Sequence, residues 1–238
     1  MSGELRVCAL YPDVMNIYAD RGNLLMLARR CTWRGIGWRL HAAGIGETLA
    51  GTGHHLYYLG GGQDADQRRC AEDLVAHKRD GLVRAAADGA VVLGVCGGYQ
   101  LLGHHYELGD ERIDGAGLLD VETVRDPGPR LIGNVAIELP DGSVLAGFEN
   151  HGGRTRLLGG QAPLGRVLCG HGNDGRSGHE GARTGNVIGT YLHGPLLPKN
   201  SWFCDWLIAT ALGSGELEPL DDELEAAAHQ SALRAAGV

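Results

Sequence analysis

The sequence has no apolar run that approaches the roughly 20 residues a membrane-spanning helix needs, which argues against membrane insertion. Its first residues contain no basic segment followed by an apolar stretch, so a secretory signal is not expected. It also has no basic run, and its formal net charge is −8, so nucleic acid is not an expected partner. Together these absences predict a cytoplasmic protein.

Metal-binding spacings are also missing. The six cysteines form no Cys-x-x-Cys pair, which is typical of free thiols in a reducing compartment. Neither His104 and His105 nor His171 and His179 have the spacing of a metal site such as His-Glu-x-x-His. A phosphate-binding G-x-x-x-x-G-K-[ST] loop is absent as well. We therefore expect no metal and no cofactor in this chain.

Glycine, in contrast, is abundant. The 238 residues include 40 glycines, more than twice the average usage of about 7%. The glycines follow no Gly-X-Y period, so they indicate tight turns and close backbone approaches rather than collagen. The length suits one large α/β domain or two small ones, and no linker divides the chain. We expect a single domain over residues 1–238.

Strand and helix patterns alternate in the first hundred residues. Strands are predicted at 5–11, 38–42, 56–59 and 90–95, and helices at 23–34, 64–87 and 97–102. This alternation predicts a three-layer α/β fold, a mostly parallel sheet flanked by helices. Further strands are expected at 118–124, 132–139, 144–149 and 187–192, and helices at 200–212 and 221–235. The Gly- and Arg-rich segment 154–185 receives no regular structure.

The most informative segment is residues 91–100, VVLGVCGGYQ, where an apolar strand ends at Cys96 between glycines and a helix begins. This is the pattern of a nucleophile elbow, G-x-C-x-G in place of G-x-S-x-G. It presents the thiol at a helix N-terminus, where the helix dipole favours the thiolate. The alternative is a buried structural cysteine, which the flanking glycines do not favour.

Two other candidate site segments, Gly60-Gly61-Gly62 and the one that contains His193, also come directly after predicted strands. The Gly97 N–H, next to the thiol, is a natural oxyanion donor, and Gly60-Gly61-Gly62 offers a second at the end of another strand. His193 follows the strand GTYL and precedes Gly-Pro, so its imidazole is expected at the sheet edge. There it would take the thiol proton and later protonate departing ammonia.

These pieces, in this order, resemble class I glutamine amidotransferases of the cobyric acid synthase type, which have a flavodoxin-like fold. Within that group the chain is most similar to the GatD family, the glutaminase subunits of lipid II isoglutaminyl synthase. The matching motifs are YPDVMN (11–16), DRGN (20–23), GGGQD (60–64), GFENHGGRT (147–155) and YLHGPLLPKN (191–200).

The resemblance implies a role for each matched residue. Cys96 would be the nucleophile that forms a γ-glutamyl thioester, and His193 the general base and acid. Gly62 and Gly97 would donate to the oxyanion. Arg130 would bind the substrate carboxylate, for which a guanidinium fork is well shaped. Weaker candidates for the lining of the pocket are Gln100, Asn150 and His151.

The resemblance also implies a partner, a MurT-like, Mur-ligase-like subunit that would hold ATP and Mg²⁺. That subunit would activate the D-glutamate α-carboxyl of lipid II, and ammonia from L-glutamine would convert it to an amide. The work would take place in a bacterial cell, at the inner face of the membrane. Alternatives are an amidotransferase for another acceptor, such as a corrinoid side chain, and a non-catalytic module that kept the fold.

One position departs from the wider family. Many class I amidotransferases carry a Glu two residues after the catalytic His, where it orients the imidazole, and Pro195 stands there in this chain. Either another carboxylate of the chain orients His193, or the partner donates one on docking. We hypothesise the second, because a group supplied in trans would keep the glutaminase slow until the partner binds.

Overall fold

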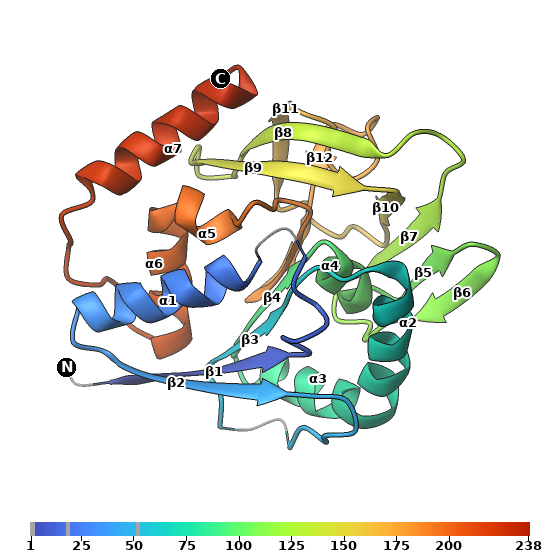
Figure 1. The fold of residues 1–238 in the computed structure, drawn as a ribbon, viewed down its shortest axis with the longest axis horizontal. Helices are drawn as coiled ribbons and strands as arrows, with labels where there is room; N and C mark the ends of the chain where they lie inside the picture. Colours follow the sequence, from blue (N-terminus) through green and yellow to red (C-terminus); the bar gives the residue numbers. More distant parts are fainter. Residues whose placement is uncertain (1–2, 18–19, 51–52) are drawn as a thin grey trace.

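The centre of the molecule is a six-stranded sheet of order β13-β14-β4-β3-β1-β2. A computed structural model describes residues 3–17, 20–50 and 53–238 (Figure 1). All neighbouring strands of this sheet are parallel except the pair β13 and β14. Its strands are β1 (Glu4–Leu10), β2 (Gly37–Ala43), β3 (Leu56–Leu59), β4 (Val91–Val95), β13 (Ala182–Thr184) and β14 (Val187–Thr190).

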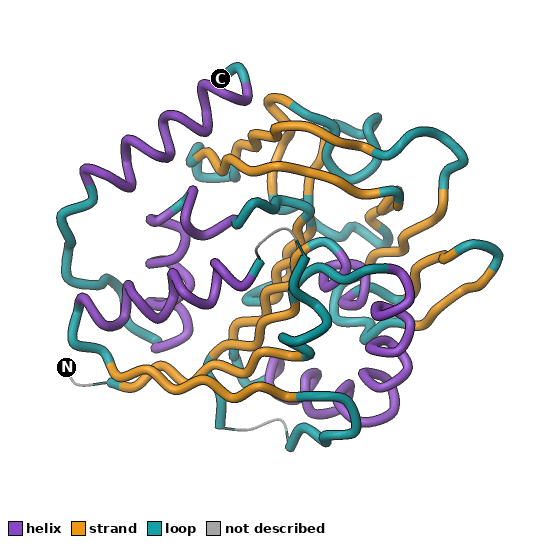
Figure 2. Tube along the Cα trace, in the orientation of Figure 1, coloured by secondary structure: helices purple, strands orange, loops and turns teal. Residues whose placement is uncertain are grey.

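Helices cover both faces of this sheet, which confirms the predicted three-layer α/β architecture (Figures 1 and 2). Helices α1 (Arg21–Trp33) and α6 (Ser201–Leu212) lie on one face, and α3 (Arg79–Ala87) and α4 (Gly97–Leu102) on the other. The helix predicted over 64–87 is interrupted between α2 (Asp64–Asp73) and α3 by a π-helical turn, η1 (Leu74–Lys78). This wider turn accompanies the buried ion pair of Lys78 with Asp73.

Two four-stranded sheets stand beside the main sheet, with orders β10-β7-β5-β6 and β12-β11-β8-β9. Their strands are β5 (His105–Leu108), β6 (Glu111–Asp114), β7 (Val121–Arg125), β8 (Leu131–Glu138), β9 (Val144–His151), β10 (Gly153–Leu157), β11 (Gly165–Cys169) and β12 (His179–Glu180). Strands β10 to β13 lie in or overlap the segment 154–185, to which the sequence assigned no regular structure. The strands found there pair with distant partners, so local composition carries little of the signal.

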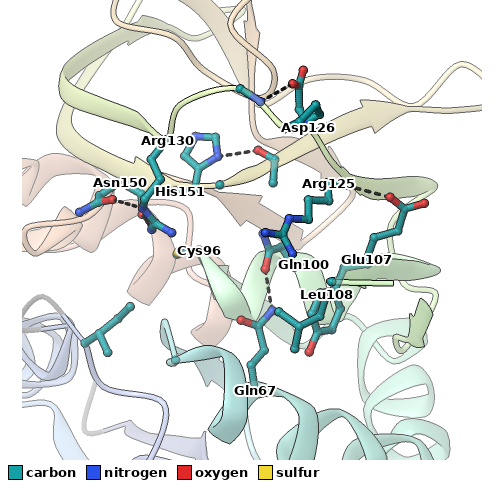
Figure 3. Close-up of a pocket in the computed structure, with 18 residues that line it drawn as sticks. Gln67, Cys96, Gln100, Glu107, Leu108, Arg125, Asp126, Arg130, Asn150 and His151 are labelled. Atoms are coloured by element: carbon teal, nitrogen blue, oxygen red, sulfur yellow. Dashed lines mark hydrogen bonds between the residues drawn. The ribbon is translucent and has the colours of Figure 1, made fainter. Parts of the chain in front are cut away.

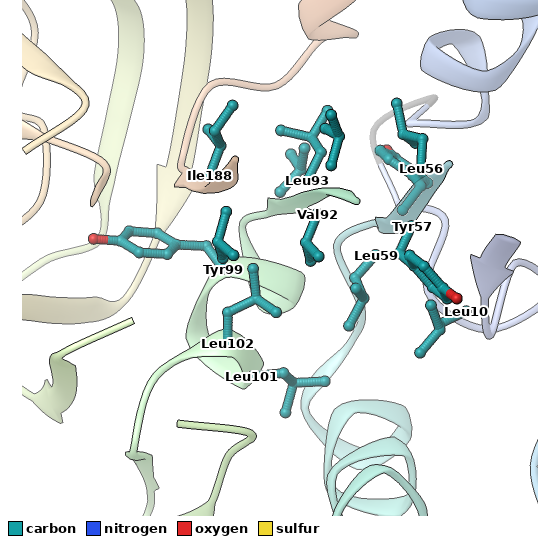
Figure 4. Close-up of a cluster of buried hydrophobic side chains, with 14 of the residues drawn as sticks. Leu10, Leu56, Tyr57, Leu59, Val92, Leu93, Tyr99, Leu101, Leu102 and Ile188 are labelled. Carbon is teal, nitrogen blue, oxygen red and sulfur yellow. The ribbon is translucent and has the colours of Figure 1, made fainter. Parts of the chain in front are cut away.

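The hydrophobic core surrounds the central strands. Every residue of β3 and β4 is buried, as expected for parallel strands that are covered on both faces. Side chains of both strands pack with Tyr99, Leu101 and Leu102 of α4 (Figure 4). Because β3, β4 and β14 are parallel, their carboxyl ends share one edge of the sheet. Residues 60–62, 96 and 193 follow these ends, so the fold gathers the predicted site there.

A buried guanidinium links helices α1 and α6 to the start of the last helix. Arg30 of α1 is fully buried and bonds Asp205 of α6 through Nε (2.7 Å) and Asp222 through Nη2 (2.8 Å). Asp222 directly precedes α7 (Glu223–Ala236), so the cluster joins α1, α6 and the start of the last helix. A short helix, α5 (Leu196–Lys199), completes the elements. In the described ranges of the chain, no helix combines the length and apolarity needed to cross a bilayer.

Candidate functional site

Cys96 lies at the bend between β4 and α4 in a conformation rarely adopted by residues other than glycine, with φ 52° and ψ −106°. Such strain persists only where the surroundings enforce it. A Cβ on Gly98 would overlap the carbonyl oxygen of Leu59, so the bend requires the glycine. The Cys96 N–H donates to Thr190 O (2.8 Å), and the side chain lines a cavity of about 370 Å³. The predicted elbow is present.

His193 is locked in place by its backbone and by its ring. Its N–H donates to Phe148 O (2.8 Å), and its carbonyl accepts from Phe148 N (3.1 Å), which ties the end of β14 to β9. The ring is fully buried and places Nδ1 3.3 Å from Asp20 Oδ1, and the Cys96 side chain is its other electrostatic neighbour. Burial alone would lower the pKa of this imidazole, but the Cys96 and Asp20 side chains outweigh it and raise the pKa to about 10.

Asp20 is the site residue to which sequence reasoning assigned no role. The carboxylate is fully buried, and its second oxygen accepts the Gly61 N–H (2.8 Å). Tyr58 Oη donates to the Asp20 carbonyl (3.1 Å), which fixes the backbone as well. The carboxylate beside His193, which was expected to orient its imidazole, thus comes from this chain itself. This favours the first of the two alternatives over our hypothesis of a group supplied in trans.

Gly62 and Gly97 are brought together by the approach of the two strand ends. A Cβ on Gly97 would lie 3.1 Å from Gly62 N, and one on Gly62 would overlap the sulfur of Met15. A side chain at Gly62 would have to displace the buried Met15, and one at Gly97 would press against the Gly62 backbone. Within the described part of the chain, neither amide N–H donates to a protein acceptor. Both remain available beside the thiol, as an oxyanion site requires.

Arg130 reaches into the cavity and is fixed by Asn150. Its Nε donates to Asn150 Oδ1 (2.8 Å) and its Nη2 to the Asn150 carbonyl (2.8 Å). Figure 3 shows both residues, with His151, on one side of Cys96. Three other charged residues, Glu107, Arg125 and Asp126, also line the cavity. The predicted carboxylate-binding arginine is thus in the same cavity as the thiol.

Gln100 and His151 also line the cavity, and both contact Tyr191 (Figure 3). Gln100 accepts from Gln67 Nε2 (2.6 Å) and donates to Tyr191 Oη (3.1 Å). His151 stacks on the ring of Tyr191 with centroids 3.6 Å apart, and burial lowers the pKa of its imidazole. Gln67 is a lining residue that the sequence analysis missed.

Comparison with known proteins agrees with this geometry. The family model of the CobB/CobQ-like glutamine amidotransferase domain matches residues 6–201. Subunit GatD of the glutamine-hydrolysing lipid II isoglutaminyl synthase from Streptococcus pneumoniae is 37% identical over 88% of this chain and 81% of its own length. The same subunit from Staphylococcus aureus is 37% identical over 95% of this chain and 94% of its own length. The predicted resemblance is confirmed.

More distant matches fit the same fold. Cobyric acid synthase from Methylobacterium nodulans is 40% identical over 51% of this chain, which corresponds to 26% of that longer protein. Among solved structures, PurLQS from Thermotoga maritima matches with a TM-score of 0.58 and 19% identity over 80% of this chain and 87% of that chain. The glutaminase domain of Trypanosoma brucei CTPS matches with a TM-score of 0.51 and 11% identity, over 90% and 96%.

Proposed function

The chain belongs to the CobB/CobQ-like glutamine amidotransferase family, and on this premise we propose that it hydrolyses L-glutamine to L-glutamate and ammonia through Cys96. The observation that carries the proposal is the arrangement at the sheet edge. A strained thiol faces a cavity, and a buried imidazole that interacts electrostatically with this thiol is held by a carboxylate. This is the nucleophile, base and orienting group of covalent amide hydrolysis.

The reaction proceeds in two halves. His193 takes the Cys96 proton, and the sulfur attacks the side-chain carbonyl carbon of glutamine. The oxyanion that forms accepts hydrogen bonds from the Gly62 and Gly97 amides. When the C–N bond breaks, the proton on His193 passes to the leaving nitrogen, so ammonia departs and a γ-glutamyl thioester remains. His193 then takes a proton from water, whose oxygen displaces the sulfur, and glutamate leaves with the thiol restored.

Asp20 acts on this sequence through His193. Its carboxylate at Nδ1 keeps the proton on that nitrogen, so Nε2 is the ring nitrogen that exchanges the thiol proton. It also stabilises the imidazolium that forms after transfer. Arg130 would pair with the substrate α-carboxylate, and Gln100, Asn150 and His151 would complete the lining of the glutamine pocket. The whole of residues 1–238 would serve as one amidotransferase domain.

For the acceptor we propose the D-glutamate α-carboxyl of lipid II. Support comes from the two GatD relatives, which match along most of their own length. The ammonia would pass to a MurT-like ligase in a heterodimer, and that partner would hold ATP and Mg²⁺. The complex would work in the cytoplasm at the inner face of the membrane, in peptidoglycan biosynthesis. A corrinoid acceptor is the second candidate, favoured only by the partial match to cobyric acid synthase.

The test separates glutamine hydrolysis from amidation. Cys96→Ser and Cys96→Ala should release no ammonia from glutamine, while the complex with the Mur-ligase-like partner should still amidate lipid II from ammonium salts. Cys70→Ser, which alters another buried thiol, is the matched control and should keep both activities. Ammonia release by Cys96→Ala at the wild-type rate would refute the nucleophile. Amidation of a corrinoid but not of lipid II would refute the acceptor.

A further inference from the structure

A second cluster of metal-ligand side chains lies away from the cavity, at the β2 edge of the main sheet. Cys8 of β1 and His41 of β2 are register partners, so their side chains leave the same face of the sheet. His54 comes just before β3 and completes the group. One donor atom of each residue, a sulfur and two ring nitrogens, lies within 4.8 Å of the other two.

The spacing of these atoms suits a tetrahedral ion. Zinc bonds of about 2.3 Å to sulfur and 2.0–2.1 Å to nitrogen place neighbouring ligand atoms roughly 3.5 Å apart. Cys8 Sγ and His41 Nδ1 are 3.9 Å apart, so a small movement of the side chains brings both to bonding distance. The two imidazoles face one another with centroids 5.1 Å apart and ring planes inclined by 22°.

Glu47 provides an observation independent of the three ligands. His41 Nε2 lies 2.5 Å from Glu47 Oε1, which leaves Nδ1 as the acceptor that points toward Cys8. A carboxylate on the far nitrogen of a histidine is the usual outer partner of a metal-bound imidazole, because it fixes the tautomer and raises the basicity of the ring. One thiolate and one carboxylate also balance the charge of a divalent cation.

Tyr57 adds a buried polar atom on the same face. It pairs with Cys8 in the register of β1 and β3, and its ring meets the edge of His54 at a centroid distance of 5.6 Å. Its hydroxyl is buried and has no hydrogen-bond partner among the described residues. Such an atom is costly unless something polar satisfies it, and a water on the open fourth position of an ion is suitable.

From this geometry we propose that Cys8, His41 and His54 form a zinc site, with Glu47 as its outer partner and a water as the fourth ligand. Binding replaces the S–H bond of Cys8 with a sulfur–zinc bond and releases one proton to solvent. The ion ties β1, β2 and the segment before β3 together. The ligands come from three separate segments, so sequence spacing predicted no metal site. The proposal is independent of glutamine hydrolysis.

The test is a zinc titration of the full-length chain against a chromophoric chelator, after removal of bound metal. The wild type should bind one Zn²⁺ per chain. His54→Gln, at a partly exposed position, should lower the affinity at least tenfold, and Glu47→Gln by about 10- to 100-fold. His77→Gln, an exposed histidine, is the matched control and should change nothing. Cys96→Ser should also keep the affinity, because Cys96 and His193 lie at another edge.

Substitution with cobalt tests whether the Cys8 sulfur binds the metal. With Co²⁺ in place of Zn²⁺, the wild type should show a thiolate-to-metal charge-transfer band that Cys8→Ser lacks. If Cys8→Ser does not fold, His54→Gln should still weaken the band in proportion to its loss of affinity. The proposal is overturned if the wild type binds no stoichiometric zinc. It is equally overturned if His54→Gln binds as tightly as the wild type, or if Cys96→Ser abolishes binding.

Discussion

Replacement of Asp20 by asparagine is the sharpest perturbation the site offers. The substitution keeps the size of the side chain and removes its charge. Asp20 accepts two contacts, one from the Gly61 N–H (2.8 Å) and one from His193 Nδ1 (3.3 Å). An asparagine has only one oxygen. If that oxygen keeps the Gly61 N–H, its NH₂ group faces Nδ1 and places the ring proton on Nε2, where it blocks transfer from Cys96.

The magnitude follows from the distance. Two unit charges 3.3 Å apart interact with about 5 kcal/mol at an effective dielectric constant near 20. Both side chains are fully buried, so solvent does not screen this term further. Since each 1.36 kcal/mol is a factor of ten in rate, and the asparagine dipole recovers part of the loss, kcat should fall roughly a thousandfold. KM should stay near the wild-type value, because Asp20 lies behind the imidazole.

The assay is ammonia release from glutamine, measured by coupling to glutamate dehydrogenase, with and without the ligase partner. Asp13→Asn, an exposed carboxylate in the same loop, is the matched control and should retain wild-type kinetics. Far-UV circular dichroism and the thermal unfolding midpoint check that Asp20→Asn folds. A folded Asp20→Asn variant that keeps kcat within tenfold of wild type would refute the role of Asp20. That result would favour a residue of the partner subunit as the group that orients His193.

The other predictions concern binding and stability. Arg130→Lys keeps the charge but loses the fork, so KM for glutamine should rise about tenfold or more in steady-state kinetics, while the exposed Arg29→Lys should not change it. Burial raises the pKa of Glu180 to about 8, so the folded state favours the protonated carboxyl, and the free energy of unfolding should fall as pH rises from about 4.5 to about 8. Glu180→Gln should flatten this dependence in thermal denaturation; an unchanged slope would exclude Glu180 as its source. Arg30→Met leaves Asp222 without its partner and Asp205 with Arg34 alone, and should cost about 3 kcal/mol in urea unfolding, against no change for Arg29→Met.

The parts of the site that sequence could predict are those whose geometry is local. The bend at Cys96 is dictated by an apolar strand and flanking glycines within ten residues, and the structure has the positive φ that this pattern implies. Apolar runs identified the parallel strands β1, β3, β4 and β14 for the same reason, whereas β2, which contains Arg39 and His41, carries a weaker signal. Arg130 and Asn150 could be placed in the pocket only through the family resemblance.

The parts that sequence could not predict depend on contacts between distant segments. Asp20 meets His193 across 173 positions of the chain, and a short acidic motif before a helix shows nothing of that contact. Of the zinc ligands proposed above, Cys8 and His41 are brought together by strand register, and His54 by the segment that leads into β3. The small strands between residues 153 and 184 pair with β7, β8 and β14. These pairings join distant segments, and the local sequence, rich in glycine and arginine, does not predict them.

The segment after β1 serves two parts of the site at once. Met15 excludes a side chain at Gly62, and Asp20 holds both Gly61 and the imidazole. Substitutions at Asp20 and Gly62 should therefore be strongly non-additive in a double-mutant cycle, although neither residue touches the other. A substitution in this stretch that displaces Met15 or Asp20 should therefore disturb the oxyanion donors and the proton transfer together.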